Sequence, residues 1–217
     1  MKKQLLSALF VLSLGLPGQI SAQVDLSRAT YIGVEQWRDT VNALPGVDRQ
    51  IVSQDIGALN LSVGIIHRNA TAPAGGRGRG AGRGGRGGGG APPPSDCGVS
   101  SGEASGARGI QHLHQTETYI IVSGAGTLVT GGSILSGRMS GPESSVTTTL
   151  NGPSCSGTIV GDVQIRDVVV GDIVIIPAGV PHGWLNIPRH VDYLSVRPDP
   201  DRVLPSDYVH PSITIRR

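Results

Sequence analysis

Three histidines and one glutamate in the C-terminal half have residue types and spacings suited to binding a metal ion. His112 and His114 stand two apart in a short predicted strand, and Glu117 follows at the start of the next strand. Side chains two apart on a strand share a face, so both imidazoles should point the same way. His182 lies in a Pro/Gly-rich turn before a later strand. Imidazoles and a carboxylate that converge from different strands would make a first-row transition-metal site with open positions.

Simpler interpretations exist for each of these residues. A buried histidine is more often a hydrogen-bonded core residue than a ligand, but three at these spacings favour metal binding. Tyr119 has the same strand parity as Glu117, and Trp184 has that of His182. Both aromatic residues could line the mouth of a ligand pocket, and both could be ordinary wall residues.

Two stretches resemble the conserved motifs of the cupin superfamily. The later one is Gly171–Asn186, GDIVIIPAGVPHGWLN, in which every spacing of the second cupin motif is matched. The earlier one is formed by Gly109, His112, His114, Glu117 and Gly124. It departs from the first cupin motif in two respects: the gap from His114 to Glu117 is one residue short, and Gly109 is nearer than usual.

The resemblance implies an all-β fold, an antiparallel jelly-roll barrel over residues 58 to 200. It implies His112, His114, Glu117 and His182 as ligands of one divalent metal, which would be Fe, Mn, Ni, Cu or Zn. If the shortened turn keeps Glu117 away, three histidines would remain.

Cupins include dioxygenases, isomerases and decarboxylases, so the resemblance implies a metal-dependent enzyme acting on a small organic molecule. The alternative is a non-catalytic module that holds a metal or a small ligand for sensing or sequestration. Cupins are often dimers, and outward-facing Leu113, Ile120 and Val122 could supply the surface of a homodimer.

The strand pattern agrees with such a barrel. A strand with one apolar face begins near Ala58, and short strands separated by Gly and Pro are predicted at 110–114, 117–123, 126–130, 158–169, 172–176, 183–187 and 191–197. No helical period lies between them, which favours an antiparallel sheet. Residues 133–157 should form a long hairpin loop. Residues 23–57 should be a helical lead-in, with Trp37, Val41 and Leu44 at helical spacing, and 201–217 a tail.

Residues 69–108 are predicted to be a flexible insertion. Its centre, 75–90, holds 11 Gly and four Arg, and glycine supplies no side chain to bury. An RNA-binding tract is the functional alternative, but such tracts use aromatic residues for base stacking and this one has none. We therefore expect no nucleic-acid partner.

The N-terminus has the pattern of a secretory signal peptide, residues 1–22, with Lys2 and Lys3 before an apolar run too short to span a bilayer. We expect cleavage after Ala22, no membrane span in the mature chain, and a periplasmic or secreted protein. These are the two lysines of the sequence, so lysine-dependent Schiff-base and P-loop chemistry is excluded from the mature chain. After export, Cys97 and Cys155 could form a disulfide or remain two unpaired thiols.

Overall fold

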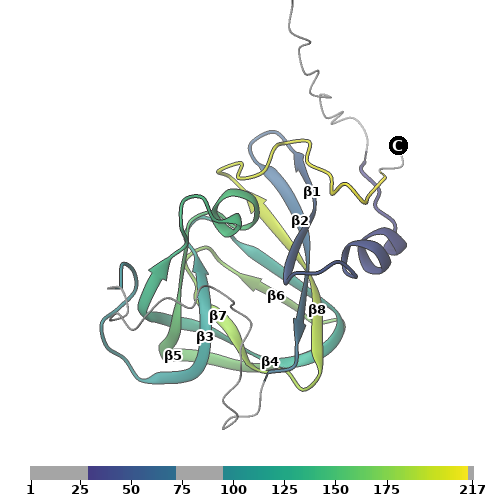
Figure 1. Cartoon of the computed structure of the whole chain (residues 1–217). Coiled ribbons are helices and arrows are strands. Elements are labelled where there is room, and N and C mark those ends of the chain that lie inside the picture. The colour runs from purple at the N-terminus through teal and green to yellow at the C-terminus, as the bar shows by residue number, and fades with distance from the viewer. Residues whose placement is uncertain (1–28, 72–94, 215–217) are drawn as a thin grey trace, which may run out of the picture.

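The computed structural model describes residues 29–71 and 95–214 (Figure 1). The predicted signal peptide and the Gly/Arg centre of the insertion lie outside the described residues. The described elements are the short π-helix η1 (Glu35–Val41), β1 (Asp48–Asp55), β2 (Asn60–Asn69), β3 (Ala104–His112), β4 (Glu117–Met139), the π-helical turn η2 (Val146–Leu150), β5 (Ser154–Val169), β6 (Ile173–Ile176), β7 (His182–Asn186) and β8 (His190–Asp199).

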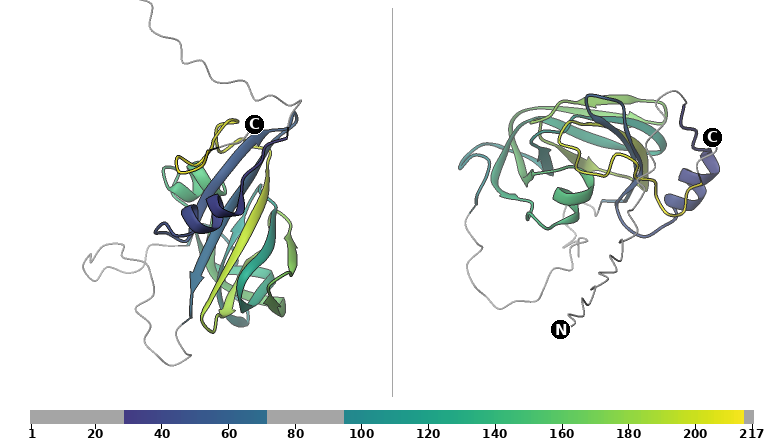
Figure 2. Two further views of the ribbon diagram at one scale, coloured as in Figure 1. Left: turned by 90° about the vertical axis from the view of Figure 1, so that its right-hand side faces the viewer. Right: turned by 90° about the horizontal axis from the view of Figure 1, so that it is seen from above.

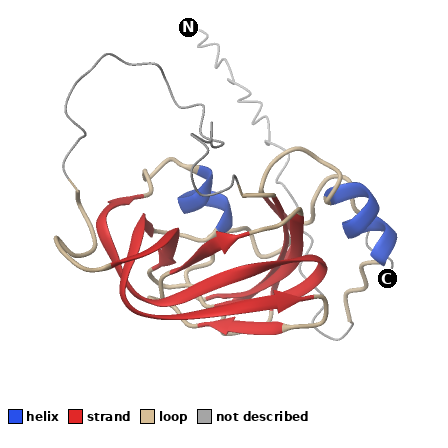
Figure 3. Cartoon of the chain, turned by 90° about the horizontal axis from the view of Figure 1, so that it is seen from below, coloured by secondary structure: helices blue, strands red, loops and turns tan. Residues whose placement is uncertain are grey.

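The strands form one antiparallel sheet that closes on itself. Their order is β1-β2-β8-β4-β5-β3-β7, β6 pairs with β4, and the terminal strand β7 pairs back onto β4. The curved strands wrap around the interior in the right-hand view of Figure 2, and in Figure 3 they make up the body of the molecule, with short helices beside them. The all-β jelly-roll barrel of the cupin fold is therefore confirmed.

Closure depends on the length of β4. Its first part, Glu117–Gly124, pairs with β6 and β8, and its second part pairs with β5 and β7. One strand thus serves both sides of the barrel. Ile121 and Leu128 of this strand pack in one core cluster and Val129 in another, and all three are almost wholly buried.

Three corrections to the predicted elements follow. The expected hairpin loop 133–157 is shorter than predicted, because β4 continues to Met139 and β5 starts at Ser154. The expected insertion 69–108 ends earlier, since β3 begins at Ala104. The lead-in contains β1, whose pattern was hidden because it buries polar Arg49, Gln50 and Ser53 beside its apolar residues.

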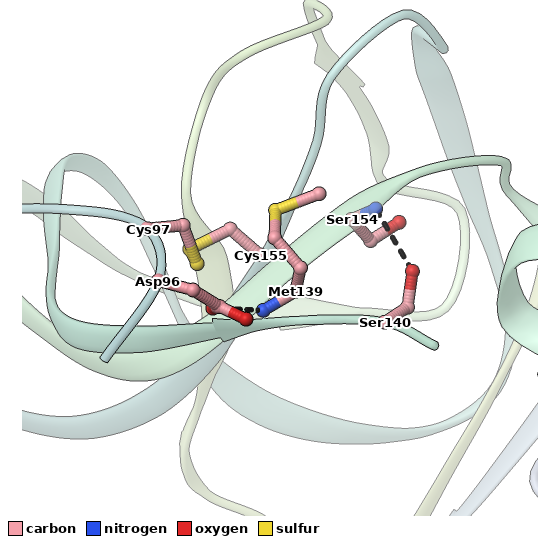
Figure 4. The surroundings of a disulfide bond; sticks show 6 residues. All are labelled: Asp96, Cys97, Met139, Ser140, Ser154 and Cys155. Carbon is pink, nitrogen blue, oxygen red and sulfur yellow. Dashed lines mark hydrogen bonds between the residues drawn. A yellow bond between two sulfur atoms is a disulfide. The ribbon is translucent and has the colours of Figure 1, made fainter. Parts of the chain in front are cut away.

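The segment after the insertion is fastened to the barrel by a disulfide between Cys97 and Cys155, whose Cα atoms lie 6.1 Å apart (Figure 4). The pairing decides between the two alternatives that the sequence left open. Nearby, the Met139 backbone N–H donates to Asp96 at 2.7 Å. The bridge thus anchors the start of β5 next to Ser154.

The lead-in helix covers a second core outside the barrel interior. Trp37 and Val41 of η1 pack with apolar residues of β1 and β2 and with Ile213 from the C-terminal segment. Val122 packs against this same cluster, so it is not a free outward-facing residue as predicted. Among the described residues, no helix is long and apolar enough to cross a membrane.

Candidate metal centre

Three of the predicted ligands meet inside the barrel, each at the end of a strand. His112 is the last residue of β3, Glu117 the first of β4 and His182 the first of β7. The strands bring them together because β7 pairs with both β3 and β4 next to His182. All three side chains are buried, with 5%, 1% and 4% of their surface exposed.

A pair of glycines allows β3 and β7 to approach closely enough. A Cβ atom on Gly109 would lie 2.4 Å from the His182 carbonyl oxygen, and one on Gly183 would lie 2.2 Å from the Arg108 carbonyl oxygen. Real Cβ atoms do not approach oxygen so closely, so any side chain here would push the two strands apart. The glycines thereby set the separation of the two histidine-bearing strands.

Hydrogen bonds hold both carboxylate oxygens of Glu117. Oε1 accepts from Ser195 at 2.8 Å, from Arg197 Nε at 2.9 Å and from Asn151 Nδ2 at 3.2 Å. Oε2 accepts from the Tyr119 hydroxyl at 3.0 Å. The orientation of the carboxylate is therefore fixed by four donors, and Oε2 is the oxygen turned toward the histidines.

Arg197 keeps this carboxylate ionised. The guanidinium is wholly buried and also binds Asp48 and Gln50 of β1. Burial alone would raise the pKa of Glu117, but Arg197 and the nearby imidazoles of His112 and His182 hold that pKa well below its ordinary value. The site thus contains a permanent negative charge.

The hydrogen bonds of His112 determine which ring nitrogen carries its proton. Nδ1 lies 2.8 Å from Ser154 Oγ, and that hydroxyl donates its own hydrogen to the Gly152 carbonyl at 2.9 Å. Ser154 must therefore accept, so Nδ1 holds the proton and Nε2 presents a lone pair. Burial lowers the pKa of His112, which favours this neutral form.

His182 has the same tautomer as His112. Its Nδ1 lies 3.1 Å from the Val180 carbonyl oxygen, which can only accept, so Nδ1 carries the proton. Its Nε2 is buried and forms no hydrogen bond with any described residue. This orphaned lone pair lies 3.2 Å from Glu117 Oε2, as does His112 Nε2.

The His182 lone pair therefore faces a carboxylate oxygen with no donor between them, which is unfavourable unless a cation lies there. The His112 lone pair points to the same oxygen and accepts from Asn151 Nδ2 at 3.1 Å. The ligand atoms of the three residues lie within 4.8 Å of one another. Atoms held about 2.1 Å from one metal lie about 3.0 Å apart at right angles and about 3.4 Å apart in a tetrahedron. The 3.2 Å separations agree with that range, so the group could hold a divalent metal.

The structure does not bring His114 into this group. β3 ends at His112, and the chain turns at Leu113, whose backbone N–H donates to the Pro153 carbonyl. The alternation of side chains that put both histidines on one face holds only within a strand. The His114 side chain is 57% exposed and pairs with Asp201 at 2.6 Å.

The sequence left open whether Tyr119 and Trp184 line a pocket mouth or are ordinary wall residues, and in the structure both belong to the packing of one core cluster. Tyr119 is buried, its ring packs edge-on against His182, and its hydroxyl binds Glu117. Burial, and next to it the charge of Glu117, raise the pKa of Tyr119, so the phenol keeps its proton. Trp184 is half-buried and packs on Tyr193.

Three neighbours of the centre were not anticipated from the sequence. Ser195 and Arg197 lie on the same face of β8 as buried Tyr193. A charged residue on an inward-facing position was the signal that the sequence offered. Asn151 follows η2, in the region predicted as a loop, and no sequence pattern marked it.

Comparisons with known proteins show similarity at the level of solved structures. A protein from Bacillus halodurans, BH2720, matches with 14% identity and a TM-score of 0.37, over 84% of this chain and 89% of that one. The CENP-C cupin domain of Drosophila melanogaster matches with 11% identity and a TM-score of 0.29, over 69% and 70%. The lyase DddQ of Ruegeria pomeroyi, which acts on DMSP, matches with 12% identity and a TM-score of 0.30, over 80% of this chain but 57% of that one.

No family profile and no curated protein sequence matches the chain. The class of protein is therefore defined by the fold and the site. It is a cupin-type β-barrel with a buried group of two histidines and one glutamate that could hold a metal ion.

Proposed function

We propose that this chain is a metal-dependent enzyme of the cupin type that acts on a small organic molecule within the barrel. The observation that carries the proposal is the orphaned Nε2 of His182, turned with the His112 lone pair toward an ionised carboxylate. A structural core would place a donor there. Both imidazoles carry their proton on Nδ1 and present a lone pair on Nε2, as metal binding requires.

Each residue of the centre would have a distinct role in such an enzyme. His112, His182 and Glu117 would hold the metal, which when bound supplies Lewis-acid polarisation of a substrate oxygen or, if it is iron, reaction with dioxygen. Ser154 and the Val180 carbonyl fix the imidazole tautomers, and Arg197 keeps Glu117 anionic. The apolar interior around Tyr119 and Tyr193 would exclude water. A dioxygenase or isomerase reaction fits this arrangement.

The test is whether the metal has an exchangeable position. Metal-free protein is loaded with Co²⁺, and azide is added while the visible absorption is followed. An enzyme site should bind azide and change the cobalt spectrum. The variant His182→Ala should stay folded and lose most of its Co²⁺. If saturating azide leaves the spectrum unchanged, the catalytic proposal is wrong.

The second candidate is a non-catalytic metal-holding module, and the depth of the site favours it. All three ligand residues expose 5% or less of their surface. A closed centre of that kind would bind Co²⁺ tightly and ignore azide. The azide experiment therefore separates the two functions.

We also propose that the protein is exported. The Cys97–Cys155 disulfide supports this, because disulfides persist in oxidising compartments. N-terminal sequencing of the secreted or periplasmic protein should start at Gln23. Recovery of the chain from the cytosol with Met1 or Lys2 at its N-terminus would contradict the proposal.

A further inference from the structure

The position that the cupin resemblance assigns to His114 is left without that imidazole, and another side chain lies at the centre. Asn151 is buried, with 5% of its surface exposed. Its side-chain nitrogen lies 3.1 Å from His112 Nε2 and 3.2 Å from Glu117 Oε1. Its amide group therefore borders the space in which a metal held by the three ligand residues would lie.

We propose that Asn151 supplies the fourth protein ligand of the centre through its side-chain oxygen, in place of His114. This inference rests on the proposed function, since it requires the centre to bind a metal. It changes the ligand set from three histidines and a glutamate to two histidines, a glutamate and an amide.

The distances suit such a role. A separation of 3.1 Å between the Asn151 amide and His112 Nε2 is the spacing of two neighbouring ligands on one metal, as are the 3.2 Å separations among the other ligand atoms. Amide oxygen is an acceptable ligand for first-row divalent metals that tolerate oxygen donors. The His114 side chain is 57% exposed and pairs with Asp201, so it does not reach the metal centre.

The orientation of the amide can change without extra room. In the structure Nδ2 donates to His112 Nε2 and to Glu117 Oε1. When a metal takes the His112 lone pair, that donor loses its partner. A half-turn of the amide then presents Oδ1, because the two ends of the group have nearly the same size. Glu117 Oε1 keeps its bonds from Ser195 and Arg197.

The backbone holds Asn151 in place. Its N–H donates to the Val146 carbonyl at 2.9 Å, which closes η2. Ser154, three residues on, fixes the tautomer of His112, and Cys155 is tied to Cys97 by the disulfide. One short segment thus carries the proposed ligand, the residue that orients another ligand, and a covalent anchor.

The test compares the two candidate fourth ligands directly. Metal-free full-length protein and its variants are titrated with Co²⁺, and both the dissociation constant and the absorption spectrum are measured. Loss of a residue that only contacts a ligand weakens metal binding about 10–100-fold. Loss of a direct ligand in Asn151→Ala should therefore weaken Co²⁺ binding by more than about 100-fold and should alter the cobalt spectrum. His114→Ala is the matched control, and it should bind within about twofold of the wild type with the same spectrum.

Asn151→Asp keeps an oxygen at the same place and guards against a folding defect in the alanine variant. It should bind Co²⁺ at least as tightly as the wild type and with a shifted spectrum, because a carboxylate replaces an amide on the metal. Circular dichroism shows whether each variant is folded.

Three outcomes overturn the inference. The first is a loss of 100-fold or less in Asn151→Ala with an unaltered spectrum. The second is an Asn151→Asp spectrum that superimposes on that of the wild type, and the third is strong weakening in His114→Ala. In each of these the wild type binds Co²⁺, so the proposed function survives. A wild type that binds no metal overturns both.

Discussion

Removal of one hydroxyl should convert His112 from a metal ligand into a hydrogen-bond donor. In Ser154→Ala the Nδ1–H of His112 loses its acceptor, the Ser154 Oγ at 2.8 Å. The proton can then move to Nε2, which lies 3.2 Å from Glu117 Oε2 and would donate to it. That tautomer gives Glu117 a donor without a metal, provided that the Asn151 amide, whose Nδ2 lies 3.1 Å from His112 Nε2, turns this donor away. The substitution therefore stabilises the metal-free protein at the expense of the loaded one.

The magnitude follows from the role of such contacts. Removing a group that orients a ligating histidine costs about 10–100-fold in metal affinity, or roughly 1.4–2.8 kcal/mol since each tenfold is about 1.4 kcal/mol. His182 and Glu117 keep their own partners, so binding should weaken and not disappear.

The assay is a Co²⁺ or Zn²⁺ titration of the metal-free protein by calorimetry. Ser156→Ala is the matched control, a serine two residues further along β5 that is half-buried. It should bind like the wild type. Unchanged affinity in a folded Ser154→Ala protein would refute the assignment of the His112 tautomer.

Three further predictions concern stability. Cys97→Ser removes the disulfide between residues 58 apart in sequence, and loss of this cross-link should lower the free energy of unfolding by roughly 4 kcal/mol in the chain-entropy account. An unchanged urea midpoint in non-reducing buffer would contradict this prediction. Gly183→Ala places a Cβ 2.2 Å from a backbone oxygen and should cost about 1–3 kcal/mol, whereas Gly141→Ala, with nothing within 4 Å, should stay within about 0.5 kcal/mol. Burial lowers the pKa of His112 in the folded state, so as the pH falls the imidazole is protonated in the unfolded chain before it is protonated in the folded one. The free energy of unfolding of the metal-free protein should therefore be at its full value above about pH 6.5 and decrease below that pH. A free energy of unfolding that does not change from pH 7 to pH 5 would contradict this prediction.

The barrel could be predicted because its motifs are local. The run from Gly171 to Asn186 contains the turn, the proline and the histidine of one motif, and the structure places His182 at the start of a strand as that spacing requires. β2 also shows its alternation directly, because Leu61, Val63 and Ile65 recur at every second position.

The failures came where a tertiary contact outweighed the local pattern. His114 follows His112 at strand spacing, yet β3 ends at His112, because the next partner on the distant strand segment is Pro153, which accepts from Leu113 but has no N–H to donate in return. No local signal reports that contact. Asn151 was missed for the same reason, since it reaches the centre only through the folding of β5 onto β3.

β1 was missed for a different reason. Its polar residues have partners inside the fold: Asp48 and Gln50 bind Arg197 behind Glu117, and Ser53 binds Ser62 of β2. Arg49 binds the Gly46 carbonyl and Asn42. A strand that carries such residues inward has no apolar alternation to recognise.

The account stands on the claim that His112, Glu117 and His182 bind a metal ion. Elemental analysis of the mature chain, purified without chelator and compared with His182→Ala, tests that claim most directly. We predict close to one first-row metal ion per wild-type chain and little in the folded variant. Metal absent from the wild type even after reconstitution, or retained in full by the variant, would contradict it.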